Sequence, residues 1–202
     1  MNALVGIPAH PEVVQKVADQ SLTLLKNEGI LPIKTGELGS LVNICVQKYE
    51  SDPSPSALAA KLEAALPGVR NFILRLEMNP AVYDKIWPDV SEADLVILSL
   101  FVLRYRAGDP APFREGDLAF IDKIIAAKPK AVIAMSYDNP HLIRKIENVP
   151  VFLVGYGEGG WYGNQTVYFD SFIKLLQGRL KPKGKLPVRV SDRCPIGCGL
   201  GY

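Results

Sequence analysis

Residues 93–101 read ADLVILSLF, a strongly apolar stretch that predicts a buried β-strand. A strand that is apolar on both faces is typical of a parallel sheet covered by helices on both sides. Further apolar runs on either side of it predict strands over 41–46, 69–76, 131–136, 149–155 and 186–190. Between them, helical periodicity predicts helices over 54–66, 113–127, 139–146 and 166–176, and a short helix or a pair of turns over 79–90.

This alternation of strands and helices predicts a three-layer α/β/α sandwich with a mainly parallel sheet of five to six strands. Before the first strand, apolar residues recur at helical spacing, and we expect an amphipathic N-terminal helix over 10–28, with Gly29 as its stop. The end of the sequence, 184–202, is expected to form a closing strand and tail. Because no internal repeat or Ser/Gly linker interrupts the pattern, residues 1–202 are interpreted as one domain.

The composition is that of an ordinary globular chain, with 48% hydrophobic and 22% charged residues among 202. A formal net charge of +2 lacks the strongly basic footprint of nucleic-acid-binding domains, so no nucleic-acid partner is expected. No apolar run approaches the roughly 18 residues that a membrane span needs, and we expect neither a signal segment nor a membrane anchor. The localisation stays open between the cytoplasm and secretion, because a longer precursor could carry its own signal.

Three cysteines are too few for a disulfide framework, and Cys45 lies in an apolar run that predicts a buried free thiol. Cys194 and Cys198 flank a Pro-Ile-Gly turn that can bring their sulfur atoms close together. The sequence leaves open whether they form a disulfide. Two sulfur ligands without a histidine at suitable spacing do not make a zinc site, so no metal is expected.

Ligands of open parallel sheets collect beyond the carboxyl ends of the strands. In this sequence those ends carry hydrogen-bonding and aromatic side chains, which suit a sugar or the surface of a partner, although they are equally compatible with ordinary polar loops. The candidate cleft or domain-interface residues are Arg104, Tyr105, Arg106, Asp109, Asp138, Asn139, Tyr156, Glu158 and Trp161.

Other chemistries find little support. Residues 155–160, GYGEGG, match a dinucleotide fingerprint, but they follow a late strand and no acidic residue follows at the required distance, so no cofactor is expected. Ser136 lacks a nucleophile elbow, and the histidines are His10 and His141 alone. The paired carboxylates of Glu115 and Asp117 are interpreted as partners of a helix N-terminus. We therefore name no catalytic residue.

Three segments carry a resemblance to a known family. Residues 17–32, VADQSLTLLKNEGILP, residues 184–188, GKLPV, and residues 195–202, PIGCGLGY, resemble the C-terminal α/β domain of family three glycoside hydrolases. Residues 136–140, SYDNP, and 177–187, QGRLKPKGKLP, resemble the β-N-acetylhexosaminidase branch of that family. The resemblance extends over essentially the whole chain, with its specific motifs at the two ends.

The resemblance implies that the domain accompanies a catalytic (β/α)₈ barrel, which 202 residues cannot also hold. In β-glucosidase members a glutamate of this domain serves as general acid, but residues 104–114 contain none, which favours the N-acetylglucosaminidase branch, with its catalytic groups on the barrel. We expect a structural and interface domain, inactive alone, whose partner is a barrel in cis or on a separate chain. The alternatives are a carbohydrate-binding or docking module without its own barrel and an independent small-molecule enzyme. With no barrel present, we also expect the chain to self-associate as a homo-oligomer through exposed aromatic side chains at the strand ends.

Overall fold

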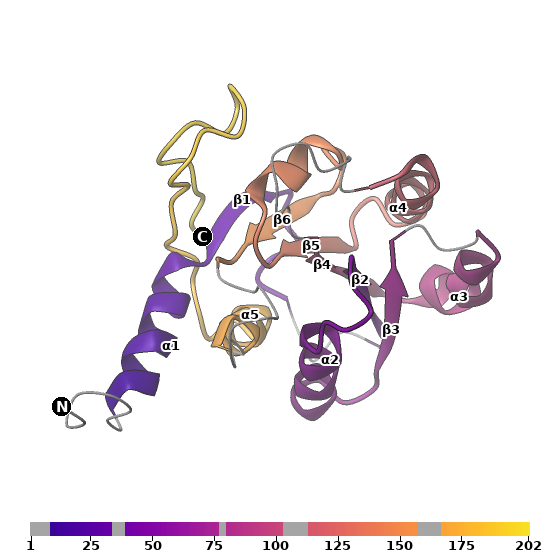
Figure 1. The fold of residues 1–202 in the computed structure, drawn as a ribbon, viewed down its shortest axis with the longest axis horizontal. Helices are drawn as coiled ribbons and strands as arrows, with labels where there is room; N and C mark the ends of the chain where they lie inside the picture. The colour runs from indigo at the N-terminus through magenta and orange to yellow at the C-terminus, as the bar shows by residue number, and fades with distance from the viewer. Residues whose placement is uncertain (1–8, 34–38, 77–79, 103–112, 157–166) are drawn as a thin grey trace.

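The computed structural model describes residues 9–33, 39–76, 80–102, 113–156 and 167–202. From residue 41 onward, strands and helices alternate along the chain (Figure 1). The helices are α1 (Ala9–Ser21), α2 (Ser54–Ala65), α3 (Pro80–Glu92), α4 (Glu115–Ala127) and α5 (Val167–Leu176), with a 3₁₀ helix, η2 (Pro140–Arg144). The strands are β1 (Thr23–Asn27), β2 (Leu41–Gln47), β3 (Val69–Arg75), β4 (Leu95–Phe101), β5 (Val132–Ser136) and β6 (Val151–Val154).

The strands form one six-stranded sheet in the order β1-β6-β5-β4-β2-β3. Strands β2 to β6 pair in parallel, and β1 pairs with β6 in the antiparallel direction. The predicted α/β class with a mainly parallel sheet is confirmed. Strand β3 at one edge is less buried than the sequence pattern implies, since Ile73 is 40% exposed.

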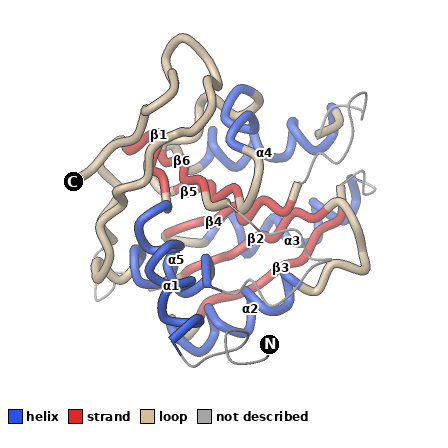
Figure 2. Tube along the Cα trace, turned by 60° about the vertical axis from the view of Figure 1, so that its left-hand side comes forward, coloured by secondary structure: helices blue, strands red, loops and turns tan. Residues whose placement is uncertain are grey.

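Two apolar cores lie on opposite faces of the sheet. Strand β4 illustrates the arrangement, because its side chains alternate between the cores and all are buried. Helices α2 and α5 cover one face, and α3, α4 and η2 cover the other (Figure 1). The result is the three-layer sandwich that the sequence predicts, with α1 added outside the α5 layer (Figure 2).

The predicted helix over 10–28 is wrong in its second half. The helix ends at Ser21, and the following residues form strand β1. Leu24 pairs with Leu153 of β6, and the two adjacent leucines enter different cores, Leu24 on the α5 face and Leu25 on the α4 face. An extended strand places neighbouring side chains on opposite faces, so pairing with β6 outweighs the local helical pattern.

The valine side chains of helix α1 lie on one face of the helix, and α1 packs against the protein through another face. Val13, Val14 and Val17 are more than half exposed, whereas Ala18 is buried. Polar side chains join α1 to α5 instead. Asp19 accepts hydrogen bonds from Ser171 at 2.7 Å and from Lys174 at 2.9 Å, the latter an ion pair.

The predicted closing strand over 186–190 is also wrong, because this segment forms no strand. The tail instead lies beside β1, and the Leu200 amide donates to the Leu24 carbonyl at 2.7 Å. Gly184 lies so close to the end of α1 that a Cβ atom there would be 2.1 Å from the Ser21 carbonyl oxygen. A Cβ at Gly199 would be 2.3 Å from the carbonyl oxygen of Gly184. Glycine is therefore required at positions 184 and 199 of the end motifs, because the backbone passes too close there for a side chain.

Two helices differ from expectation in kind or length. Residues 139–146 form the short 3₁₀ helix η2 rather than an α-helix, and residues 80–92 form a regular α-helix, α3, that includes Pro88. Within the described ranges no helix is long and apolar enough to cross a membrane.

Candidate functional site at the carboxyl ends of the strands

The carboxyl ends of the parallel strands meet at one edge of the sheet, as the sequence predicts. The pairing register aligns Gln47 of β2 with Phe101 of β4, and Ser136 of β5 with Val154 of β6. Of the nine candidate residues, Asp138, Asn139 and Tyr156 lie in the described part of this edge. The other six, Arg104, Tyr105, Arg106, Asp109, Glu158 and Trp161, lie outside the described residues.

A cluster of buried aromatic rings packs next to this edge of the sheet. Tyr137, which directly follows β5, stacks on Phe101 with ring centroids 4.6 Å apart. Phe169 and Phe172 of α5 meet the Tyr137 ring edge-on. Because Tyr137 is fully buried and packed on three rings, the backbone that carries Asp138 is held rigidly.

Asp138 is a partly buried carboxyl group whose pKa is raised above the usual range by burial. It makes no hydrogen bond with the other described residues. A carboxylate in this state gains stability from any hydroxyl or cation that reaches it. Asp138 is therefore the described candidate with the clearest capacity to receive a ligand.

Gln47 begins the strand end over 47–52 that the sequence places at this edge, although it is not among the nine candidate residues. Its side chain is buried, and its Oε1 atom has no hydrogen-bond partner among the described residues. Buried polar atoms are normally paired, so an unpaired one marks a position for a donor. Strand β4 lies between β2 and β5, which places Gln47 about 10 Å from the end of β5 at the usual strand spacing.

Asn139 has a structural role. Its side-chain oxygen accepts a hydrogen bond from the His141 amide at 3.0 Å and so caps η2. Its backbone exchanges hydrogen bonds with the Ser136 hydroxyl at 2.9 and 3.1 Å. The Asn-Pro turn is thus explained by local geometry, and Asn139 shapes the loop that presents Asp138.

Tyr156 follows β6 and lies against both cores. Its hydroxyl donates to Thr23 of β1 at 3.5 Å, and burial raises the pKa of this phenol. Gly155 before it has no room for a side chain, since a Cβ would lie 2.8 Å from the Tyr168 ring. Tyr156 therefore joins the strand-end edge to β1 rather than projecting freely.

The two carboxylates at the start of α4 do not form a catalytic pair. Asp117 is buried, accepts the Arg114 amide at 2.9 Å and receives the Tyr83 hydroxyl at 2.5 Å. Its first contact caps the N-terminus of α4, and its second joins α4 to α3. This agrees with the interpretation of Asp117 as a partner of the helix end.

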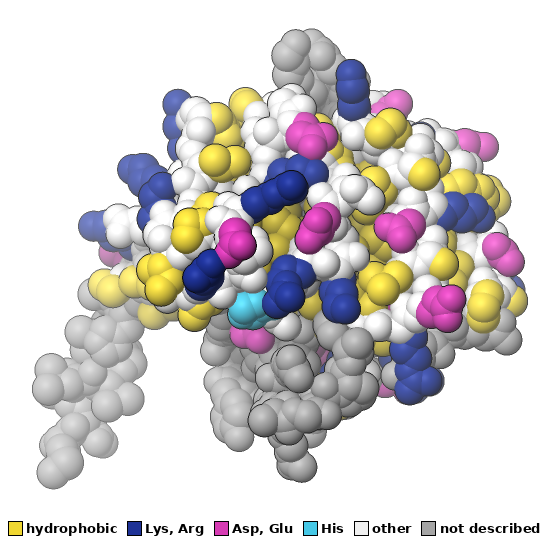
Figure 3. Space-filling model, turned by 90° about the horizontal axis from the view of Figure 1, so that it is seen from above, with side chains coloured by type: hydrophobic (Ala, Val, Ile, Leu, Met, Phe, Trp, Pro, Cys, Tyr) yellow, Lys and Arg dark blue, Asp and Glu magenta, His cyan; other side chains and the backbone are white. Residues whose placement is uncertain are grey.

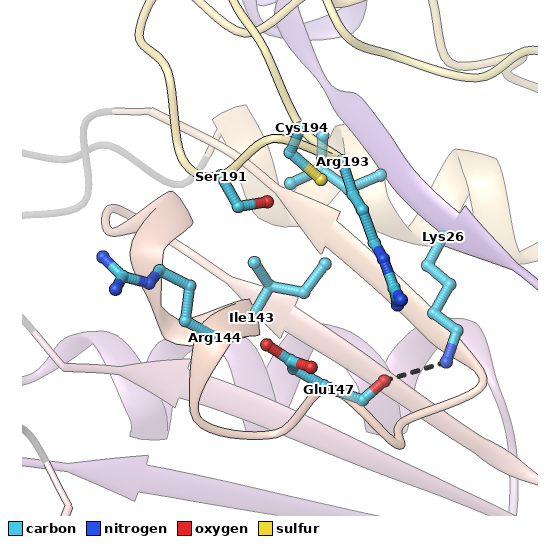
Figure 4. Close-up of a pocket in the computed structure, with 8 residues that line it drawn as sticks. Lys26, Ile143, Arg144, Glu147, Ser191, Arg193 and Cys194 are labelled. Atoms are coloured by element: carbon cyan, nitrogen blue, oxygen red, sulfur yellow. Dashed lines mark hydrogen bonds between the residues drawn. The ribbon is translucent and has the colours of Figure 1, made fainter.

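A separate hollow of about 240 Å³ lies between β1, η2 and the tail. Figure 4 shows the Lys26 ammonium group donating to the Glu147 carbonyl, at 2.9 Å, with Arg193 extending toward both residues and Arg144 turned away. Leu25 and Ile143 supply apolar walls, and Cys194 also lines the hollow. No local sequence pattern predicts this hollow, because its walls come from three distant segments.

The described residues include no group of three or more His, Cys, Asp or Glu side chains that could hold a metal ion. The face in Figure 3 carries basic and acidic side chains side by side, with apolar groups between them. Such mixed charge offers no continuous basic track for a nucleic-acid backbone on that face.

Comparison with known proteins connects this fold to family 3 glycoside hydrolases. A β-N-acetylglucosaminidase of this family from Paenibacillus sp. str. FPU-7 matches with a TM-score of 0.71 and 20% identity over 89% of this chain. The β-glucoside phosphorylase BglX matches with a TM-score of 0.64 and 18% identity over 91% of the chain. A β-glucosidase from Listeria innocua matches with a TM-score of 0.63 and 16% identity over 85%. No family model matches the sequence, and no curated protein is significantly similar to it.

The match is one-sided in length. This chain covers 32%, 32% and 25% of those three structures, so it corresponds to a part of each. In fold, the chain is similar to one portion of family 3 glycoside hydrolase structures, and the resemblance that its sequence motifs indicate is confirmed at that level.

Proposed function

We propose that this chain is the structural and interface domain of a β-N-acetylhexosaminidase-like glycoside hydrolase and lacks a complete active site of its own. The observation that carries the proposal is the one-sided match, in which almost all of this chain corresponds to about a third or less of several glycosidase structures. The remaining part of such an enzyme would be a catalytic (β/α)₈ barrel, in cis or on a separate chain.

The chemistry of the described site supports this assignment. Retaining glycosidases need two carboxyl groups about 5 Å apart, one as nucleophile and one as acid and base. Among the three described candidates at the strand-end edge, Asp138 is the one carboxylate. Asp117, at the start of α4, is engaged by Tyr83 and the Arg114 amide. This arrangement suits a domain that completes or borders an active site on another domain.

The surface of α1 offers a second point of contact with a barrel. Val13, Val14 and Val17 expose 58%, 51% and 56% of their surface on a helix whose opposite face is fixed to α5. Neighbouring exposed apolar side chains commonly mark an interaction surface. We assign this face to the contact with the catalytic domain.

The N-acetylglucosaminidase specificity is the finer part of the proposal. It rests on the absence of a glutamate in residues 104–114 and on two structural matches whose descriptions name a β-N-acetylglucosaminidase. Other matched structures are described as β-glucosidases, so the aryl N-acetylglucosaminide and the aryl glucoside are the two substrates to compare.

The test is a reconstitution. The chain alone is expected to hydrolyse neither aryl β-N-acetylglucosaminide nor aryl β-glucoside above a buffer blank, whereas its complex with the barrel encoded in the same or an adjacent gene should prefer the N-acetylglucosaminide. Turnover by the isolated chain, or a barrel equally active without it, would contradict the proposal.

A carbohydrate-binding module without a barrel is the second candidate. The buried Oε1 atom of Gln47, which has no partner among the described residues, and the partly buried Asp138 favour it, because sugar hydroxyls would satisfy both acceptors. Calorimetric titration with chitobiose and cellobiose distinguishes the candidates. Binding by the isolated chain, lost in Asp138→Ala but kept in the exposed helical control Asp122→Ala, would favour the module.

A further inference from the structure

The tail contains a pair of thiols that the glycosidase assignment does not use. Cys194 and Cys198 are separated by the turn Pro195-Ile196-Gly197, and all three cysteines of the chain are free thiols. Gly197 has a φ of +82°, a conformation that glycine adopts without strain, and it turns the chain back on itself.

Backbone hydrogen bonds hold both cysteines in place. The Cys194 amide donates to the Ser191 carbonyl at 3.1 Å, and the Cys194 carbonyl accepts from Val190 at 3.0 Å. The Cys198 amide donates to Pro195 at 3.0 Å, and its carbonyl accepts from Leu186 at 2.8 Å. Two fixed attachment points leave the side chains little freedom to move apart.

The two cysteines lie in one environment. Cys194 is a buried member of an apolar core, and Cys198 packs against the same core. The Cys198 Sγ atom lies 4.0 Å from the carbonyl oxygen of Arg193, the residue that precedes Cys194. Cys194 is buried and Cys198 is partly exposed, so one thiol of the pair is open to a reagent. Cys45 differs in each respect, since it is fully buried in β2 and burial raises the pKa of its thiol to about 12.

We propose that Cys194 and Cys198 form a reversible intrachain disulfide by exchange with a small anionic disulfide of the glutathione type. The Cys198 thiolate attacks one sulfur of the oxidant and releases one thiol, and the Cys194 thiolate then attacks Cys198 and releases the second. Overall, the disulfide bond of the reagent breaks and one disulfide bond forms between Cys194 and Cys198. The two protein thiols are oxidised, and the reagent is reduced to two thiols.

The charges around the pair favour an anionic oxidant. The Lys185 ammonium group binds the Gly199 carbonyl at 2.6 Å, next to Cys198. Burial and the neighbouring Cys194 raise the pKa of the Cys198 thiol, and the Lys185 charge opposes part of that rise. On the other side, the hollow that Cys194 lines contains three cations, Lys26, Arg144 and Arg193, and one carboxylate, Glu147 (Figure 4). Lys26 also forms an ion pair with Glu28 at 3.0 Å, so Arg144 and Arg193 supply the excess positive charge. Positive charge on both sides attracts the carboxylates of a glutathione-like reagent.

The experiment uses the full chain in buffers with graded ratios of oxidised to reduced glutathione. Free thiols are then alkylated under denaturing conditions, and the masses of the tryptic peptides are measured by mass spectrometry. Both tail cysteines lie in the single peptide 194–202, whereas Cys45 lies in 35–48. We expect peptide 194–202 to lose both alkylation sites together, while 35–48 stays fully alkylated, and we expect the exchange to be faster at pH 9 than at pH 7.

Matched variants separate the two steps. Cys194→Ser should retain a glutathione adduct on Cys198, because no second thiol resolves it, and Cys45→Ser should behave like the parent chain. The proposal would be overturned if peptide 194–202 kept both thiols under the most oxidising buffer. It would equally be overturned if the parent chain accumulated a lasting adduct or a disulfide-linked dimer instead of the internal disulfide.

Discussion

Helices α1 and α5 lie side by side, yet they are held to the protein in opposite ways (Figure 2). Helix α5 buries Phe169, Phe172, Leu175 and Leu176 almost completely in the core. Helix α1 leaves its valines exposed and is fixed to α5 by the Asp19 carboxylate, which meets Ser171 and Lys174. One helix is part of the core, whereas the other is attached to its outside by polar contacts.

The contrast shows that apolar periodicity alone does not identify the face by which a helix packs. In α5 the apolar face meets the sheet. In α1 the apolar face is left for another surface, which we assign to a catalytic domain. The five predictions below test this difference, from the largest expected effect to the smallest.

Phe172→Ala in α5 should lower the free energy of unfolding by about 3–5 kcal/mol, the usual cost of deleting a buried aromatic side chain. Phe172 is fully buried and meets Tyr137 edge-on, so its removal leaves a cavity that its neighbours cannot fill. Urea unfolding measures the loss. The matched truncation in α1, Val14→Ala, should change stability by less than about 0.5 kcal/mol, and similar losses in both variants would refute the contrast.

Asp19→Asn should lower the free energy of unfolding by about 2 kcal/mol at pH 7, because hydrogen bonds to a charged group contribute more than neutral ones. The amide keeps the shape of the side chain but loses the ion pair with Lys174. The same unfolding assay detects the loss, and Asp192→Asn on the exposed tail is a suitable control. A variant as stable as the parent chain would show that α1 is held by something else.

The contribution of Asp19 to the free energy of unfolding should also depend on pH. Burial alone would raise the pKa of Asp19, but hydrogen bonds from Ser171, Lys174 and Gln15 outweigh burial and lower the pKa below its usual value of 3.8. Because the folded-state pKa is lowered, the stabilisation is present above the unfolded-state pKa and disappears as the pH falls through the folded-state value. The difference between Asp19→Asn and the parent chain should therefore shrink below about pH 4.

Tyr168→Phe should cost about 1 kcal/mol, the typical net value of one hydrogen bond. The Tyr168 hydroxyl on α5 and the Ser21 hydroxyl on α1 are 2.8 Å apart, and this contact secures the end of α1. Hydrogen exchange should show faster opening of the last turn of α1, with α5 unchanged. Equal acceleration in both helices would indicate that they open as one unit.

Replacing Val13, Val14 and Val17 together by serine should have the smallest effect on the chain itself, below about 0.5 kcal/mol for each exposed site. The same change should weaken association with a catalytic domain, or reduce self-association if the face joins two copies. Sedimentation of the variant and the parent chain, alone and with the barrel, measures both. Unchanged association in every mixture would exclude the valine face as an interface.

The sequence predicts the central sheet well, because β2, β4 and β5 are short apolar runs flanked by helical patterns. Each of these strands is buried on both faces, so its local pattern and its final environment agree. The prediction is wrong for strand β1, where the local pattern and the final environment disagree. Residues 24–27 continue a helical pattern, and only pairing with β6 and with Leu200 makes them extended.

The candidate site is predicted only in part. The position at the carboxyl ends of the strands, and Asp138 within it, follow from the strand assignments. The surroundings of the Gln47 Oε1 atom and the contacts of Asp19 do not follow from the strand assignments, because each depends on neighbours from distant parts of the chain. Asp19 and Lys174 are separated by 155 positions, and no local pattern records that distance. The roles of Arg104 and Trp161 stay predictions.

The position of β1 has a consequence for synthesis on the ribosome. Thr23–Asn27 is made well before its partners, β6 and Leu200, which lie more than 120 residues further along the chain. At a translation rate of roughly 5–20 residues per second, the leucines of β1 wait on the order of ten seconds without a strand to pair with. During that interval the nascent chain presents the two leucines of β1 as an unpaired apolar segment.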